Sequence, residues 1–203
     1  AKFNFDLFRE HVGKAMRMMD DIIDLELEKV DLIINKVASD PEEADIRHVE
    51  HELWLKIKDM ALRGRRTGLG ITAEGDMLAA LGLRYGSNEA IDFAVEVHRT
   101  LALAAYRASV KMAEERGAFP IYDAAREAMN PMIERIKEAD PELYAEMVKH
   151  GRRNIAMLTI APTGTTSLMS QTTSGIEPVF RPVYKRRRKI NPSDKGKTAD
   201  FVD

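Results

Sequence analysis

Apolar side chains recur at steps of three and four residues from the start of the chain, which predicts a long amphipathic helix running toward Ile34. The stripe consists of Phe5, Phe8, Val12, Ala15, Met16, Met19, Ile22 and Ile23. The other face of this helix is acidic and carries Asp20, Asp21, Asp24, Glu26 and Glu28. Because no Glu-x-x-His pairing accompanies these carboxylates, we interpret them as a solvated face rather than a metal cluster.

Capping residues predict where later helices begin. In Asp40–Glu43, an aspartate is followed by proline and two glutamates, an arrangement that favours a helix N-terminus. Ser87 opens a second long apolar pattern that continues to Glu115 and is followed by glycine and proline. The pair Asp140-Pro141 repeats the first signal and predicts a short helix to about Lys149.

Two histidines in the helix predicted after Asp40, His48 and His51, lie three residues apart and share a face. A zinc-protease helix needs a spacing of four, with glutamate directly after the first histidine. Neither condition is met, so we interpret both histidines as surface residues.

The segment Gly68–Ala73 matches the dinucleotide fingerprint G-x-G-x-x-A in form. That fingerprint must follow a buried strand, whereas this segment follows a charged Arg-Gly-Arg-Arg stretch at the end of a helix. We therefore interpret it as a glycine-permitted passage into a short helix over Glu74–Leu81.

Composition restricts the chemistry. The 203 residues include no cysteine, so no thiol nucleophile, redox dithiol or thiolate metal site comes from this chain. The chain lacks a secretory signal and a transmembrane-length apolar run, which predicts a cytoplasmic protein without a membrane partner. It begins without Met and ends at Asp203 without an evident stop. This suggests a piece of a longer protein, although processing or tag removal explains it equally well.

The charge is unevenly distributed. The whole chain carries a net charge of −2, which does not favour nucleic-acid binding, whereas residues 181–203 carry eight basic and three acidic residues, or +5. The run Lys185–Lys189 has the charge to neutralise phosphates. No aromatic residue interrupts it, so we interpret it as a solvated or interdomain segment.

The apolar pattern changes at Ile155–Ile160, a six-residue run that predicts a buried strand. The hydroxyl-rich loop Thr163–Ser167 follows, and then apolar Leu168-Met169, giving the order strand, loop and helix start. Free N–H groups and hydroxyls at a helix start favour a phosphate, and Gly164 allows close approach. The loop lacks the lysine of a Walker A motif. A hydroxyl-rich N-cap without a ligand fits the composition equally well.

Glu177 is the carboxylate nearest to this loop in the sequence. It has the chemistry of a base or a polar anchor, and a structural contact to loop amides is an equal alternative. Pro178 removes a donor and biases Glu177 away from helix, which predicts a turn leading into an extended segment.

Several blocks resemble one known family. They are residues 68–78, 115–120, 154–167, 174–180 and 183–192. In this order they resemble the large subunit of ribonucleotide reductase, specifically the adenosylcobalamin-dependent class II. The resemblance implies a fragment of a ten-stranded α/β barrel, here mostly helical with a few short strands. It assigns residues 1–180 to the barrel, with a helical part (1–150) and a phosphate-loop part (151–180), and leaves 181–203 as a basic extended tail that continues into a missing region.

The resemblance also implies a function. Members of this family replace the ribose 2′-hydroxyl of a nucleotide by hydrogen, using a thiyl radical that abstracts the 3′-hydrogen. The residues implied to bind the substrate phosphates are Pro162, Thr163, Gly164, Thr165 and Thr166, with Ser167 at the edge of the loop. Its position in the sequence, and not the resemblance, makes Glu177 a candidate supporting residue behind this loop. Adenosylcobalamin is the implied cofactor of the parent enzyme, and a ribonucleoside diphosphate is its implied substrate.

The chain departs from the family pattern because the radical cysteine, the reducing cysteine pair, and the Asn and Glu beside them have no counterpart here. We therefore nominate no catalytic residue and no metal ligand, and we expect these residues to be inactive alone. The expected partner is the remainder of the reductase chain or a complementary subunit. An alternative is a non-catalytic scaffold that docks on a cysteine-bearing partner of a split reductase. A free-standing phosphate-binding module is a third reading.

Overall fold

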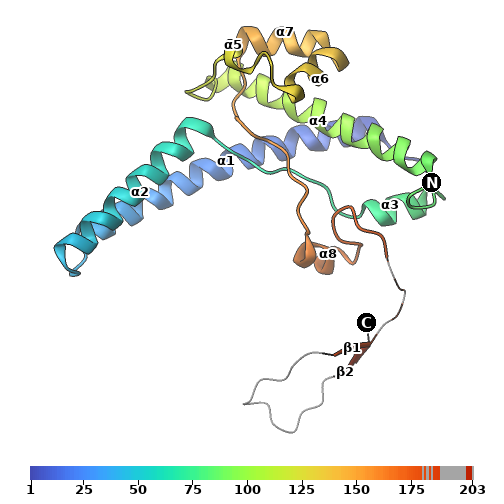
Figure 1. Ribbon diagram of the computed structural model, residues 1–203, viewed down its shortest axis with the longest axis horizontal. Coiled ribbons are helices and arrows are strands. Elements are labelled where there is room, and N and C mark those ends of the chain that lie inside the picture. Colours follow the sequence, from blue (N-terminus) through green and yellow to red (C-terminus); the bar gives the residue numbers. More distant parts are fainter. Residues whose placement is uncertain (180, 182, 184, 188–199, 203) are drawn as a thin grey trace.

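The computed structural model describes residues 1–179, 181, 183, 185–187 and 200–202, and helices dominate this part of the chain (Figure 1). The helices are α1 (Phe5–Ala38), α2 (Ala44–Gly64), α3 (Glu74–Ala80), α4 (Asn88–Arg116), α5 (Ala124–Glu127), α6 (Pro131–Ala139), α7 (Pro141–His150) and α8 (Gly164–Ser170). Two short strands, β1 (Lys185–Arg187) and β2 (Asp200–Val202), pair antiparallel. No described helix is long and apolar enough to cross a lipid bilayer.

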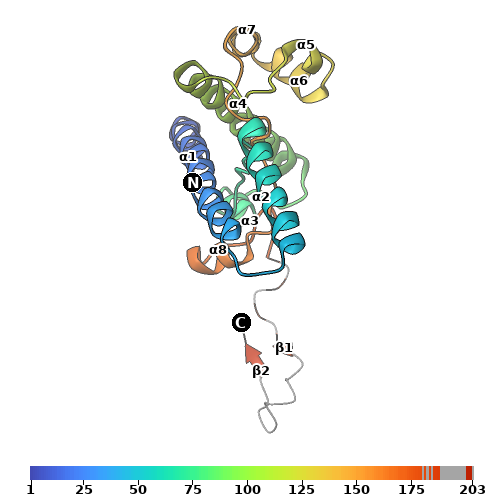
Figure 2. The same ribbon diagram turned by 90° about the vertical axis from the view of Figure 1, so that its left-hand side faces the viewer.

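The helix α1 is the predicted first helix, extended by one turn beyond Ile34. It begins at Asn4, whose side chain accepts a hydrogen bond from the Leu7 amide at 3.1 Å. It runs beside α2 to form a long two-helix arm, and its first half crosses α4 (Figures 1 and 2). The predicted apolar stripe is the reason: Val12, Met16 and Ile23 are all buried.

The predicted start of the second helix at Asp40-Pro41 is wrong, because α2 begins at Ala44. The Asp40 amide donates to the carbonyl of Val37 at 3.2 Å, one residue after the C-cap Ser39 of α1. Its carboxylate accepts only from the Glu42 amide within the connection, at 3.3 Å. The cap signal therefore builds the turn between the helices rather than the first turn of α2.

The helices α4 and α7 begin as predicted. Ser87 accepts from the Ala90 amide and Asp140 accepts from the Leu143 amide. The small residues Ala105 and Ser109 of α4 are completely buried, and α4 packs against both α1 and α7 (Figure 2). The pattern above misses α5 and α6, although Asn130, before the proline at the first position of α6, is the same start signal.

The apolar core surrounds α4. Its members are Val12, Met16, Leu101, Ala105, Tyr106, Val110, Met112, Ile133, Ile136, Leu143, Met147 and Met157. They come from α1, α4, α6, α7 and the segment after α7, so the core joins the first residues of the chain to residues near 157. Helices α5–α7 lie above α4 in Figure 1, and α8 lies on the opposite side of α1, between α1 and the β1/β2 pair.

The prediction of a buried strand over Ile155–Ile160 is only partly realised. The segment is extended and pairs in parallel with residues 64–69, through bonds such as Leu69 N to Met157 O at 2.7 Å. Met157 is buried, but Ile160 is 65% exposed. Pairing along one edge leaves the other side of the segment uncovered among the described residues. The part of the chain that the structure describes therefore contains one parallel pair, and not a closed barrel.

The basic tail falls largely outside the described residues. Of the run Lys185–Lys189, the first three residues form β1, and Arg188 and Lys189 lie outside the described part. β1 and β2 are extended, with Arg186 opposite Phe201 in the register.

Candidate functional site

The hydroxyl-rich loop stands at the end of the parallel pair, where the chain turns sharply into α8. Thr163 is the residue before α8 and has a positive φ of 50°, which is unfavourable for a residue with a branched side chain. Its hydroxyl accepts a hydrogen bond from the Gly175 amide at 2.7 Å and meets the Thr72 hydroxyl at 2.9 Å. Three segments distant in sequence thus hold this turn.

Three of the four described non-glycine residues with positive φ lie beside the loop, and the fourth, Arg65, ends α2. Among the described residues, the non-glycine residues with positive φ are Arg65, Ala73, Thr163 and Gln171. All four lie either on the segment that pairs with residues 155–159 and leads into α3, or at the two ends of α8. Such conformations persist only where surrounding contacts impose them, and they cluster at functional sites.

The residues before and within α3 clamp the far side of the loop. Ala73 and Glu74 donate their amides to the carbonyls of Thr173 and Gly175, both at 3.1 Å. The Asp76 carboxylate accepts from the Thr173 amide at 2.9 Å. Sequence reasoning treated this segment as a simple passage between helices and therefore missed its role in positioning the loop.

Close packing at Gly75 makes this clamp sensitive to a single methyl group. A Cβ at Gly75 would lie 2.6 Å from the carbonyl oxygen of Glu177 and 3.0 Å from Cα of Pro178, whereas nothing lies within 4 Å of a Cβ at Gly13 in α1. We expect Gly75→Ala to lower the free energy of unfolding by about 1–3 kcal/mol in urea denaturation. The control Gly13→Ala should raise it by about 0.5–1 kcal/mol, because alanine favours helix. If Gly75→Ala raised the free energy of unfolding as Gly13→Ala does, close packing at Gly75 would be excluded.

The predicted phosphate-binding residues divide into an outward and an inward set. Gly164, Thr165 and Thr166 are exposed, and their amide N–H groups find no acceptor in the described part of the chain. Ser167 is buried, and its hydroxyl donates to the carbonyl of Gly164 at 2.8 Å and meets the Ser174 hydroxyl at 2.8 Å. Pro162 is exposed and has no N–H to offer.

A hollow of about 370 Å³ adjoins the loop on the side of the parallel pair. Its lining comes from three segments: Tyr85, residues 160–162, and residues 175–178. The Tyr85 hydroxyl donates to the carbonyl of Ile176 at 2.8 Å, which fixes one wall. Glu177 lines the hollow and is exposed, while its amide donates to the carbonyl of Ser174 at 2.9 Å.

Large apolar side chains surround this region without being covered. Leu168 and Met169 on α8 are 81% and 83% exposed, and Val179 is 60% exposed. Ile160, at the end of the parallel pair, is 65% exposed. Four large apolar side chains on the segments around the loop are therefore exposed to solvent.

A second set of polar residues corrects the prediction of a solvated acidic face on α1. Asp20 is completely buried, while Asp21 and Asp24 are exposed. These three carboxylates lie close enough together to share a cation, but arginines already neutralise them: Arg65 binds Asp20 and Asp24 at 2.8 Å, and Arg116 binds Asp21 at 2.7 Å. The cluster is a structural ion-pair network. Glu26 and Glu28 are exposed, as predicted.

His48 and His51, which the sequence analysis interprets as surface residues, both lie on α2. His48 is exposed and His51 is half-buried on α2, and neither belongs to a group of potential ligands there. A histidine contact that the sequence did not predict joins α4 to α3: His98 Nε2 lies 2.8 Å from a carboxylate oxygen of the buried Glu74.

The sequence of this chain is similar to that of known proteins of one family. The family model described as ribonucleotide reductase, barrel domain, matches residues 1–194. The chain is 32% identical over 186 residues to a vitamin B12-dependent ribonucleoside-diphosphate reductase of Mycobacterium tuberculosis, covering 92% of this chain and 21% of that protein. A protein of the same name from Thermoplasma acidophilum is 30% identical over 98% of this chain and 22% of the relative.

A ribonucleoside-diphosphate reductase subunit alpha from Chlamydia pneumoniae is 26% identical over 90% of this chain and 17% of its own length. The chain therefore spans about a fifth of the length of the curated relatives it matches. With a family model covering almost all of its residues, the chain belongs to the ribonucleotide reductase family, within the barrel domain.

Proposed function

We propose that this chain supplies the substrate phosphate-binding loop, Pro162–Ser167, of an enzyme that reduces ribonucleoside diphosphates to deoxyribonucleotides by a radical mechanism. The observation that supports the loop is the run of exposed amides at Gly164, Thr165 and Thr166, which find no acceptor among the residues that the structure describes. Family membership supports the reaction.

The inward and outward residues have different tasks in this proposal. The amides of Gly164, Thr165 and Thr166 and the two threonine hydroxyls donate to phosphate oxygens. Thr163 and Ser167 hold the loop in shape through their bonds to Gly175 and to Gly164. Pro162 closes the edge toward the hollow of about 370 Å³, where Glu177 stands behind the loop.

The reduction requires groups that these residues do not contain. Replacing the 2′-hydroxyl by hydrogen releases water and needs two electrons, which a pair of thiols supplies on becoming a disulfide. The 203 residues include no cysteine, so the radical thiol and the reducing thiols come from other polypeptide. We therefore expect no turnover from these residues alone, even with cofactor and dithiol added.

The cofactor of the parent enzyme is adenosylcobalamin in this proposal, since the Mycobacterium and Thermoplasma relatives are named vitamin B12-dependent. When bound, this cofactor would supply the radical chemistry of the parent enzyme. Grooves over the described residues measure about 540 and 610 Å³ and are open to solvent. Pockets of about 300–1,000 Å³ suit drug-sized ligands, and a corrin with its nucleotide loop is larger. The described residues do not fit the whole cofactor, so no step here is assigned to it.

A second function follows from the exposed apolar side chains around the loop. Exposed Ile160, Leu168, Met169 and Val179 favour docking on further polypeptide that carries the cysteines, as in a split reductase where this chain is a scaffold. Co-purification tests this alternative. A cysteine-bearing partner that restores activity on mixing would support it, and a stable monomer that binds no partner would exclude it.

Gly164→Asp tests the loop directly. The added carboxylate stands where the phosphate would bind, so we expect the dissociation constant for a ribonucleoside diphosphate to rise at least about tenfold in calorimetry, a loss of about 1.4 kcal/mol. Gly164→Ala is the matched control, because nothing lies within 4 Å of a Cβ at this position and alanine adds no charge. Equal binding by wild type and Gly164→Asp would exclude the loop as the phosphate site.

A further inference from the structure

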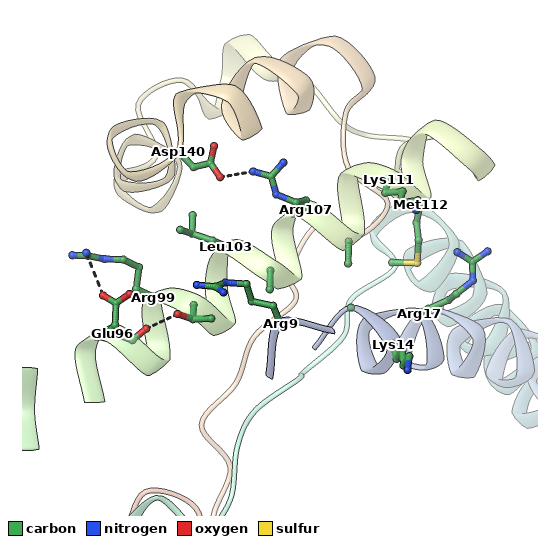
Figure 3. Close-up of a pocket in the computed structure, with 14 residues that line it drawn as sticks. Arg9, Lys14, Arg17, Glu96, Arg99, Leu103, Arg107, Lys111, Met112 and Asp140 are labelled. Atoms are coloured by element: carbon green, nitrogen blue, oxygen red, sulfur yellow. Dashed lines mark hydrogen bonds and ion pairs between the residues drawn. The ribbon is translucent and has the colours of Figure 1, made fainter. Parts of the chain in front are cut away.

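A groove of about 540 Å³ between α1 and α4 is lined by arginines and lysines whose charges are largely paired (Figure 3). Arg99 lies 3.6 Å from Glu96, and Arg107 pairs with Asp140. Carboxylates beside the groove pair with the lining cations of α1 in the same way. The hydrogen bonds that bear on function lie instead around Thr72, beside the hydroxyl-rich loop.

Thr163 precedes α8 but does not cap it. A threonine in this position ordinarily accepts a hydrogen bond from the second or third amide of its helix, here Thr165 or Thr166. The Thr163 side chain makes no such bond, and its φ of 50° is left-handed. The residues that precede α1, α4, α5 and α6 are extended, and each accepts from an amide of its own helix. The first amides of α8 thus lack the cap that these helices have.

Thr72 contacts the Thr163 hydroxyl from the far side of the loop. The Thr72 hydroxyl lies 2.9 Å from that of Thr163 and donates to the carbonyl of Thr173 at 3.2 Å. It also accepts from the Gly175 amide at 3.2 Å, and the Thr163 hydroxyl accepts from the same amide at 2.7 Å. Because the Thr72 proton is directed to Thr173, the Thr163 hydroxyl donates to Thr72. Both hydroxyl protons then have acceptors within the protein.

The backbone next to Thr72 keeps its side chain in this position. Ala73 has a positive φ of 66°, and its amide donates to the same Thr173 carbonyl at 3.1 Å. The Glu74 amide donates to the carbonyl of Gly175, also at 3.1 Å. These bonds do not involve the Thr72 hydroxyl. A substitution that removes only this hydroxyl therefore leaves the pairing of the two segments in place.

We propose that Thr72 is a positioning residue of the phosphate-binding loop: it holds the Thr163 hydroxyl inward, so that Thr163 does not cap the amides that bind phosphate. This inference rests on the proposed function of the loop. Thr72 acts through Thr163 and not on the phosphate itself.

Loss of the Thr72 hydroxyl changes the balance at Thr163. A positive φ persists only where contacts impose it, and one of those contacts is removed. Thr163 then populates an extended conformation in which its hydroxyl accepts from the Thr165 or Thr166 amide. Phosphate binds only the open conformation, so its apparent affinity falls with the population of that conformation.

Calorimetry with ADP on the 203-residue chain tests this role. Thr72→Val removes the hydroxyl and keeps the branched shape, whereas Thr72→Ser keeps the hydroxyl. Thr67→Val is the matched control, because Thr67 lies on the same segment and donates its hydroxyl to the carbonyl of Ala156 at 3.2 Å, away from the loop. We expect the dissociation constant of ADP to rise at least about fivefold in Thr72→Val, as for the loss of one hydrogen bond, and less than about twofold in the other two. If Thr72→Val does not fold, Thr72→Ala takes its place.

The background Thr163→Gly shows whether Thr72 acts through Thr163. Glycine adopts a positive φ without strain and has no hydroxyl with which to cap α8. In this background we expect Thr72→Val to change the dissociation constant of ADP less than about twofold. An undiminished effect there would overturn the proposal. Equal effects of Thr67→Val and Thr72→Val in the unmodified chain would also overturn it.

Amide hydrogen exchange without ligand gives a second measurement. Thr72→Val removes one of the two acceptors of the Gly175 amide, so this amide should exchange several-fold faster than in the wild type. The amide of Thr165 or Thr166 should exchange more slowly, because Thr163 caps it. Unchanged exchange at all three amides would overturn the positioning role.

Failure of this proposal and failure of the loop as a phosphate site give different results. Equal binding of ADP by the wild type and Gly164→Asp would reject the loop, and with it the effect of Thr72 on binding, whatever the exchange rates are. Loss of ADP binding in Gly164→Asp together with unchanged binding in Thr72→Val would support the loop and reject only the positioning role.

Discussion

Replacing Asp20 by asparagine is expected to lower the free energy of unfolding by about 3–5 kcal/mol at neutral pH, because it removes the buried counter-charge of Arg65, which would keep only the half-exposed Asp24 as its partner. Asp20 is completely buried and binds Arg65 at 2.8 Å, Arg153 at 3.2 Å and Arg116 at 3.3 Å. The Asn154 side chain donates to it at 2.9 Å. Asparagine cannot supply the charge and would turn an N–H₂ group toward one of these donors.

The same substitution should flatten the dependence of stability on pH. Burial alone would raise the pKa of Asp20, but hydrogen bonds from Arg65 and Asn154, with the charges of Arg65 and Arg153, outweigh it and lower the pKa. The stability that the ionised Asp20 carboxylate contributes is complete above the pKa of aspartate in the unfolded chain, about 3.9. It is lost as pH falls through the lower pKa of Asp20 in the folded chain. Wild type should therefore lose stability below about pH 4 more steeply than the variant.

Urea denaturation at neutral and acidic pH measures both effects. Asp24→Asn is the matched control, because Asp24 also lies 2.8 Å from Arg65 but its side chain is 49% exposed. Its cost should be below about 1 kcal/mol. If the two aspartate variants lost the same stability, burial of Asp20 would not be the source of the effect.

Replacing Arg152 by leucine is expected to cost a similar amount, about 3–5 kcal/mol. Arg152 is almost completely buried and holds both carboxylate oxygens of Glu127. Its guanidinium carbon lies 5.3 Å from the ring centre of Phe119 and 5.8 Å from those of Tyr106 and Tyr122. This one side chain therefore joins α4, α5 and the segment that precedes the loop.

Arg152→Lys distinguishes charge from shape. Lysine keeps the positive charge but cannot bind Glu127 with two parallel hydrogen bonds or stack as a plane on the rings, so we expect it to restore only part of the lost stability. The control Arg63→Leu removes an exposed arginine that lies 3.3 Å from Asp59, and it should cost less than about 1 kcal/mol in the same thermal or urea measurement. Full recovery by lysine would show that charge alone matters.

The sequence predicted the elements whose signals are local. The stripe of α1, the serine cap of α4 and the Asp140-Pro141 start of α7 depend on residues within one or two helical turns. The same local reasoning placed the start of α2 too early. There the aspartate carboxylate accepts from the Glu42 amide within the connection and caps neither helix, and a single sequence does not distinguish such a turn from a helix start.

Contacts between distant residues could not be predicted. Asp20 is buried because Arg65, Arg116 and Arg153, at separations of 45 to 133 positions, converge on it, and its own neighbours in the sequence indicated a solvated face. The residue types of the loop predicted phosphate binding, but only the fold determines which hydroxyl groups are directed into the protein. Thr163 and Ser167 are bound to Gly175 and Gly164, and Thr165 and Thr166 face outward.

The Asp20 network also sets an order of events on the ribosome. Arg153 is 133 positions after Asp20, and at about 5–20 residues per second about 7–27 s separate the two. During that interval Asp20 has Arg65 and then Arg116 as partners but lacks the hydrogen bonds from Arg153 and Asn154, so its buried network is completed only when residue 154 has been made. Contacts that span so much chain also slow folding.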